Sequence, residues 1–204
     1  LPFVVLAAIA AGFSRWSWST GLLVVGLLVL LFFRDPRRRF AGSDEVLSAP
    51  ADGKVLTVDV VEDPAIGPGR FRRVVTFLNV FDVHVQRVPG PGQVLKSELQ
   101  PGAKVPAYRP DAGEVNEQQV TVLRRDNGDV IGVRQIAGLV ARRVVGYLRA
   151  GDRVERGRLL GVIKFGSRVD LMVPESYEIL VRPGDRVRNG ETPMARPASA
   201  SSPR

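Results

Sequence analysis

The 204-residue chain contains no cysteine and only one histidine, His84. Without cysteine, disulfides, thiolate metal ligands and cysteine nucleophiles are excluded. A single imidazole also excludes a site with several histidine ligands, and we expect no metal. General acid–base chemistry must therefore use His84, a carboxylate, a hydroxyl or an amine.

Long apolar runs are missing as well. Residues 1–13 and 21–33 are apolar runs of 13 residues each. As helices they would be about 20 Å long, shorter than the roughly 30 Å core of a bilayer. Two arrangements fit: a hairpin that dips in from one side, or two short spans in a thinned bilayer. We expect residues 1–39 to be a membrane-associated helical leader with a basic stop. A signal peptide is the alternative interpretation.

The formal net charge is +8, and arginine supplies most of the cations. These cations are spread along the chain and no nucleic-acid motif accompanies them, so we expect no nucleic-acid partner. Together with the apolar leader, they favour an anionic lipid surface. The arginines at residues 34–39 mark the cytoplasmic end of the leader by the positive-inside tendency. We therefore expect a location at the cell membrane, with the remainder of the chain on the cytoplasmic face.

From residue 46 onward the apolar runs become short and are broken by Gly, Pro and Asp. This pattern is typical of a mainly β domain with tight turns, and we place that domain at residues 44–195. A short helix is expected near residues 137–145, and a polar disordered tail at 196–204. The runs that we expect to form strands are residues 54–61, 72–80, 92–95, 117–124, 130–136 and 158–163.

One internal repeat stands out. The pattern Gly-Asp-x-Val-x-x-Gly occupies residues 151–157 and recurs at residues 184–190. Each copy reads as a turn, one inward apolar residue and a second turn. Two copies predict two similar hairpin layers, and hence a barrel-sandwich-like fold.

The peptide bond between Gly166 and Ser167 is a candidate for self-cleavage. It lies between two strand-like runs, and glycine leaves its carbonyl open to attack because it has no Cβ. The Ser167 hydroxyl can reach back to that carbonyl. Cleavage would then leave a modified amino terminus, so the protein would make its own cofactor.

Self-cleavage needs a base for the serine proton and stabilisation of the oxyanion. Asp52, in a turn before a strand, and His84 are the available partners. On a strand, Asp82, His84 and Gln86 would share one face, which predicts an imidazole beside a carboxylate.

Several segments resemble the short-form (type A) phosphatidylserine decarboxylase proenzymes, a pyruvoyl-dependent family. The resemblance covers about residues 22–195, and its most specific part is Phe-Gly-Ser-Arg at the cut, where longer relatives have Leu-Gly-Ser-Thr. The segments that carry it are PADGKV at residues 50–55, NVFDVHVQRVP at 79–89, IKFGSRVD at 163–170 and FFRDPR at 32–37.

This resemblance implies a carboxy-lyase made by self-processing. Attack of Ser167 on the Gly166 carbonyl, followed by elimination, would give a β chain (residues 1–166) and an α chain (residues 167–204) that begins with a pyruvoyl group. The amine of phosphatidylserine would form a Schiff base with that group, and carbon dioxide would leave to give phosphatidylethanolamine. The substrate would lie in an anionic membrane.

The chain departs from the longer relatives at one position of this resemblance. They have two histidines three residues apart, whereas this chain has His84 and then Arg87. His84 therefore serves either self-cleavage or decarboxylation. Arg87 and Arg168 are candidate contacts for the carboxylate or phosphate of the substrate, since a guanidinium can bind either group bidentately.

Three alternatives stay open. The same pyruvoyl chemistry could act on a soluble amino acid, although the apolar leader argues against this. The chain could also be a membrane-anchored barrel-sandwich carrier or adaptor without enzymatic activity. The oligomeric state is open too, with a homo-oligomer among the choices.

Overall fold

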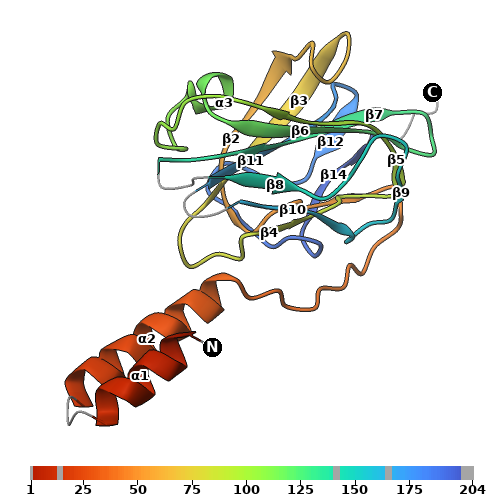
Figure 1. Ribbon diagram of the computed structural model, residues 1–204. Helices are drawn as coiled ribbons and strands as arrows, with labels where there is room; N and C mark the ends of the chain where they lie inside the picture. Colours follow the sequence, from red (N-terminus) through yellow and green to blue (C-terminus); the bar gives the residue numbers. More distant parts are fainter. Residues whose placement is uncertain (1, 13–15, 140–142, 164–166, 199–204) are drawn as a thin grey trace, which may run out of the picture. The chain divides into compact units, whose positions relative to one another are not determined.

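The computed structural model describes residues 2–12, 16–139, 143–163 and 167–198. The chain forms two compact units, Leu1–Asp35 and Pro36–Arg204 (Figure 1). The first unit is helical. The second is built almost entirely from strands, so the expectation of a mainly β protein is confirmed.

Two helices, α1 (Pro2–Gly12) and α2 (Trp16–Phe32), form the first unit. They approach closely at Gly26, where a Cβ would lie only 3.1 Å from the Cβ of Phe3. Most large apolar side chains of this unit, such as Leu27, are exposed. Helix α2 begins earlier than the second apolar run, because residues of the polar interruption continue it. In the part of the chain that the structure describes, no helix combines the length and apolar character needed to cross a membrane.

The second unit contains one large antiparallel sheet and two small ones (Figure 1). The large sheet has the order β13 (Arg186–Val187), β2 (Gly53–Glu62), β3 (Arg70–Leu78), β11 (Ser167–Pro174), β7 (Val130–Ile136), β6 (Gln118–Arg124), β5 (Gly92–Gln100) and β9 (Arg153–Val154). The small sheets have the orders β1 (Leu47–Ser48), β14 (Pro193–Pro197), β12 (Tyr177–Ile179) and β4 (Val85–Arg87), β10 (Leu159–Ile163), β8 (Val144–Gly146). A single turn of helix, α3 (Ala112–Val115), lies in the loop between β5 and β6.

Apolar side chains are buried on both faces of the large sheet. On one face, Leu78 and Val169 join residues of both small sheets, such as Met194 and Ile163, in the main core. On the other face, Met172 belongs to a smaller cluster. The two small sheets therefore pack on the same face of the large sheet, and they cover the side chains that alternate with those of the smaller cluster.

The two copies of the glycine repeat have equivalent places in this fold. Strand β9 of the first copy pairs with β5, and strand β13 of the second copy pairs with β2, so the copies lie at opposite ends of the large sheet. The small sheets match in the same way. The two halves of the large sheet, which meet at the β11–β7 pair, therefore have the same order. In each half, the outermost strand is the last along the chain, and the next three strands follow one another in chain order.

The expected strands largely agree with the observed ones, but three expectations do not hold in full. Only Val85–Arg87 of the segment around His84 is strand, and Asp82 lies in a turn. The helix expected near residues 137–145 falls partly outside the described residues, and its described end belongs to strand β8. Strand β14 continues to Pro197, two residues into the expected tail, because its residue Arg196 pairs with Glu178 of β12.

Candidate active site

Ser167 is the first residue of β11, where it pairs with Leu78 of β3. Its side chain shares a face with Val169 and therefore points toward the main core. The residue is fully buried, and its Oγ has no hydrogen-bond partner among the described residues. Most buried hydroxyls are hydrogen-bonded, so an unpartnered one is a candidate functional position; Thr76 Oγ1 shares this state among the described residues. Gly166, the other side of the expected cut, lies outside the described residues.

The only imidazole of the protein, that of His84, is also buried. Its Nδ1 lies 2.9 Å from the carbonyl oxygen of Asp82. A carbonyl oxygen can only accept, so Nδ1 carries a proton in this contact. The expected carboxylate partner is thus replaced by a backbone oxygen. The reason is that Asp82 lies in a turn, where its own carboxylate accepts from the backbone N–H of Asn79 at 2.8 Å.

Two short segments connect His84 with Ser167. The carbonyl oxygen of His84 accepts from the backbone N–H of Ile163 at 3.3 Å. Ser167 follows Ile163 by four residues, which span at most about 14 Å when fully extended. The second connection is the chain segment from Leu78, which pairs with Ser167 across the β3–β11 ladder, to His84. The fold therefore brings the candidate nucleophile and the candidate base to one region of the core.

Asp52 lies in the turn before β2 and is held on both carboxylate oxygens. Arg38 donates to Oδ2 at 2.9 Å, and the backbone N–H of Asn189 donates to Oδ1 at 2.8 Å. Burial raises the pKa of this carboxyl, while the Asn189 N–H, Arg38 and the backbone N–H of Val83 lower it. The last of these groups is next to His84 in the chain. Asp52 therefore lies beside the segment that carries the imidazole.

A chain of buried amides extends from His84 across the main core. Gln86 donates from Nε2 to the carbonyl oxygen of His84 at 2.8 Å, and Gln135 donates to Oε1 of Gln86 at 2.9 Å. Strand β7 places Gln135 opposite Val169, two residues from Ser167. These amides fix the backbone on both sides of the candidate site.

Arg87 lies at the junction of the two repeat copies. Its Nη1 donates to the carbonyl oxygen of Gly157, the last residue of the first copy, at 2.7 Å. A Cβ on Gly190, the last residue of the second copy, would lie 3.5 Å from Cδ of Arg87. The side chain is half-buried, and alternation along β4 places it on the opposite side from Gln86.

Arg168 follows Ser167 but points to the opposite face of the large sheet. Its Nε and Nη2 donate to the two oxygens of Asp170, both at 2.7 Å, and its Nη1 donates to the carbonyl oxygen of Pro110 at 3.4 Å. Both members of this ion pair are almost completely buried. Burial raises the pKa of the Asp170 carboxyl, and Arg168 counteracts that shift. Asp52 therefore lies beside the His84 segment, whereas Arg168 points to the face of the large sheet opposite Ser167.

The site predicted from the sequence did not include Arg38, Asn189 or Gln135, and Gln86 was named only as sharing a strand face with His84. One signal was available for Asn189. It occupies the position in the second repeat copy that Arg156 has in the first, so a difference between the copies marks it. Arg38 was hidden among the other arginines of the basic stop.

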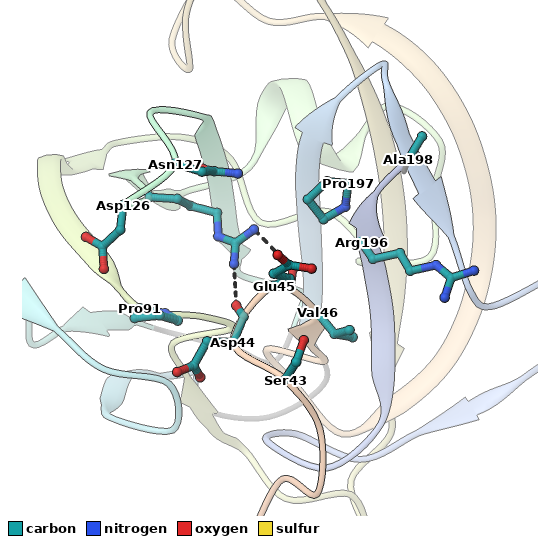
Figure 2. A pocket seen from close by; sticks show the side chains of 11 residues that line it. Ser43, Asp44, Glu45, Val46, Pro91, Asp126, Asn127, Arg196, Pro197 and Ala198 are labelled. Atoms are coloured by element: carbon teal, nitrogen blue, oxygen red, sulfur yellow. Dashed lines mark hydrogen bonds between the residues drawn. The ribbon is translucent and has the colours of Figure 1, made fainter. Parts of the chain in front are cut away.

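A surface cavity with a volume of about 710 Å³ lies elsewhere. Figure 2 shows residues of its wall, among them Asp44, Glu45 and Arg196. None of the described residues that line it was predicted for the site. Arg125 inside it donates to the carbonyl oxygens of Asp44 and Glu45, which makes its role structural. The buried polar groups therefore locate the chemistry better than the size of a cavity does.

Comparison with known proteins identifies the family of the chain. The family model for phosphatidylserine decarboxylase matches residues 25–195. The chain belongs to the phosphatidylserine decarboxylase family. The phosphatidylserine decarboxylase proenzyme of Symbiobacterium thermophilum is 43% identical over 198 residues, which is 96% of this chain and 92% of that protein. The proenzyme of Saccharopolyspora erythraea is 43% identical over 205 residues (98% and 87%), and that of Salinibacter ruber is 41% identical over 189 residues (90% and 83%).

Family membership confirms the expected activity, a carboxy-lyase that acts on phosphatidylserine. The relatives are named as proenzymes, in agreement with a precursor that is processed to a pyruvoyl enzyme with two chains. The matched range includes all the predicted site residues.

Proposed function

We propose that the chain cuts itself between Gly166 and Ser167 and then converts phosphatidylserine to phosphatidylethanolamine. Ser167 Oγ attacks the Gly166 carbonyl carbon, and the acyl group moves from nitrogen to oxygen to give an ester. Elimination releases the β chain with a terminal carboxylate and leaves dehydroalanine at position 167. Water then replaces the nitrogen as ammonia, which leaves a pyruvoyl group at the start of the α chain.

The observation that carries this proposal is the buried, unpartnered hydroxyl of Ser167 in the described structure. A small ketone fits where this hydroxyl lies, because the position has no competing hydrogen bond to break. The surrounding strands hold residue 167 in place after cleavage, since β11 stays paired with β3 and β7.

In this proposal His84 accepts the Ser167 proton through Nε2. The backbone oxygen of Asp82 holds Nδ1 protonated, and this tautomer leaves Nε2 to act as the base. The Asp52 carboxylate, paired with Arg38 beside the same segment, stabilises the positive charge that develops on the imidazole. A second role for His84, the return of a proton after decarboxylation, fits the same location.

The pyruvoyl group supplies the carbonyl that binds the substrate amine and draws electrons from the bond to the carboxylate. Arg87 is the proposed contact for a substrate carboxylate or phosphate, since its guanidinium is half-buried and comes from the strand that follows His84. For Arg168 we propose positioning in place of direct substrate contact. Its bidentate pair with Asp170 fixes the guanidinium within β11, and its Nη1 connects the strand to the carbonyl oxygen of Pro110.

We also propose that residues 1–39 hold the enzyme at the cell membrane, with residues 44–195 as a cytoplasmic barrel-sandwich-like domain of the short form and residues 196–204 as a tail. The exposed apolar side chains on both helices of the leader support this. Matching strand orders at the two ends of the large sheet support the barrel-sandwich assignment.

Replacement of Ser167 tests the proposal. The variant Ser167→Ala should remain a single uncut chain near 22.2 kDa with no decarboxylase activity, because alanine has no nucleophile. Ser97→Ala, at a half-buried serine of β5, is the matched control and should be cut normally. Denaturing gels and intact-mass measurement provide the readout. A normally cut Ser167→Ala chain would rule out the assignment, and an uncut, inactive parent would favour a carrier or adaptor.

A further inference from the structure

The turn between β3 and His84 displays two large apolar side chains to solvent. Val80 is 51% exposed and Phe81 is 76% exposed. The turn itself is firmly built. The Asn79 N–H donates to the Asp82 carboxylate at 2.8 Å, the Phe81 N–H donates to Oδ1 of Asn79 at 2.8 Å, and the Asp82 N–H donates to the Asn79 carbonyl oxygen at 3.1 Å. Its apolar tip is therefore held in a defined position.

This tip lies next to the candidate active site. Strand β3 ends at Leu78, which pairs with Ser167, and the turn begins at the next residue. His84 follows Phe81 by three residues, on the other side of the same turn. A surface that engages the tip would consequently lie close to the segment that carries His84 and to the start of β11.

Cations and a further aromatic ring lie beside the tip. The side chain of Arg186 is 70% exposed and reaches the Asp82 carboxylate at 3.2 Å. Lys54, also exposed, pairs with both Arg186 and Phe77 across the edge of the large sheet. The ring of Phe77 meets the exposed ring of Tyr108 with centroids 6.4 Å apart. An apolar tip flanked by cations is complementary to an anionic bilayer surface. The apolar side chains can meet the acyl chains, and the cations can meet the phosphates that lie above them.

We infer that this patch, made of Val80, Phe81, Tyr108, Lys54 and Arg186, docks on an anionic phospholipid bilayer. Val80 and Phe81 enter the acyl region, while the two cations meet lipid phosphates and carboxylates. Docking brings the rim of the Ser167 site to the membrane surface, so a lipid headgroup reaches it without leaving the bilayer completely. The inference rests on the proposed function only in taking a bilayer lipid as the substrate.

The main test is the double variant Val80→Ser/Phe81→Ser in the full, processed chain. Self-cleavage on gels and turnover of a short-chain, monomeric phosphatidylserine should stay normal. With vesicles of phosphatidylcholine and phosphatidylserine, the lipid concentration for half-maximal rate should rise about tenfold, since two apolar side chains no longer enter the bilayer. Val60→Ser is the control. This residue is 38% exposed near the far end of β2 and should leave both assays unchanged.

A charge variant tests the second half of the inference. We compare binding to vesicles that contain phosphatidylserine with binding to vesicles of phosphatidylcholine alone. Lys54→Gln should lower the ratio of these two affinities by about fivefold at low salt. The difference should shrink as the salt concentration rises.

Three outcomes of the double variant would overturn the inference. Unchanged kinetics on vesicles would show that the patch does not dock, and an equal loss on monomeric and vesicle substrate would assign the turn to catalysis. A changed association state in detergent with unchanged vesicle kinetics would make the patch a contact between copies, and would overturn it as well.

A spectroscopic measurement covers the case in which the double variant does not fold. Phe81→Trp should show quenching by vesicles with brominated acyl chains beyond that of the parent, whose only tryptophans are Trp16 and Trp18. Val60→Trp should add none. Absence of extra quenching at position 81 overturns docking, whatever the activity. If the parent chain shows no decarboxylation while Phe81→Trp is still quenched, the proposed function is rejected and membrane docking is not.

Discussion

The two copies of the glycine repeat share one backbone frame but carry different side chains. In the first, the N–H of Gly151 donates to Val94 and the N–H of Gly157 donates to Val88, both to carbonyl oxygens. In the second, Gly184 donates to Val55 and Gly190 donates to Ala49 in the same way. The partner segments, residues 49–55 and 88–94, are therefore equivalent, with Asp52 at the position of Pro91.

The difference between the copies separates structure from chemistry. In the second copy, the backbone of Asn189 donates to the Asp52 carboxylate, and Arg38 binds the same group. In the first copy, the equivalent positions hold Arg156 and Pro91. Arg156 donates to the carbonyl oxygens of Ser43 and Val46 and lies over the ring of Phe40. The second copy thus holds the charged group of Asp52, whereas the first copy binds the segment at residues 40–46.

Replacement of Asp52 should have the largest effect on self-cleavage among the changes that distinguish the two copies. Asp52→Asn removes the carboxylate beside the His84 segment, and self-cleavage should slow by about a hundredfold or more, the typical size of a general acid–base contribution. Pro91→Ala, at the equivalent position, should be processed at the parent rate. The measurement is a time course of precursor cleavage on denaturing gels after cell-free synthesis. Similar rates for Asp52→Asn and the parent would remove Asp52 from the site.

Arg38 should have a smaller, pH-dependent effect. Burial raises the pKa of Asp52 and Arg38 lowers it, so Arg38→Gln should raise this pKa further. Processing requires the ionised carboxylate in our proposal, and the acid limb of its rate should therefore move to higher pH. The loss of processing rate should therefore be largest at acid pH and should shrink as the pH rises.

Arg156→Gln is the matched control for this shift, since its contacts in the first copy are backbone oxygens, a ring and the exposed carboxylate of Asp44, and not Asp52. Its acid limb should stay at the parent position, although the protein loses stability. Arg38→Lys should recover part of the shift because it restores the charge. An unchanged acid limb in Arg38→Gln would show that this arginine is only structural.

Much of the fold could be predicted from local pattern. Short apolar runs between glycine and proline turns identified most long strands, and the repeat indicated two similar layers. The turn at residues 79–82 was missed because the Asp82 carboxylate accepts a backbone N–H there, which ends the strand-like alternation early. A pattern of period two cannot register such a competing hydrogen bond.

The candidate site was predictable only where its residues are chemically rare. His84 is the single imidazole, and Ser167 follows a glycine between two strands. Arg38 could not be distinguished from its neighbours, since its partner Asp52 becomes adjacent only after the chain folds. Arg168 was assigned by its place in a motif, but alternation along β11 turns it to the face opposite Ser167.

The smallest expected effect tests whether the two frames are equivalent. Gly151 and Gly184 have φ angles of +92° and +101°, and a Cβ at either position would meet no atom within 4 Å. Alanine at each should therefore cost only the backbone strain of a left-handed residue, about 1–2 kcal/mol. Gly67→Ala is the control, because a Cβ there would make only an ordinary contact, 3.9 Å from the ring of Phe71.

Thermal unfolding of the processed chain in detergent measures these costs. The two variants should lower Tm by the same few degrees, about 2–6 °C, with normal self-cleavage. Unequal shifts would mean that one hairpin bears more of the stability than its counterpart. A loss of processing in Gly184→Ala alone would show that the frame itself, and not only the carboxylate on it, sets the geometry of the site.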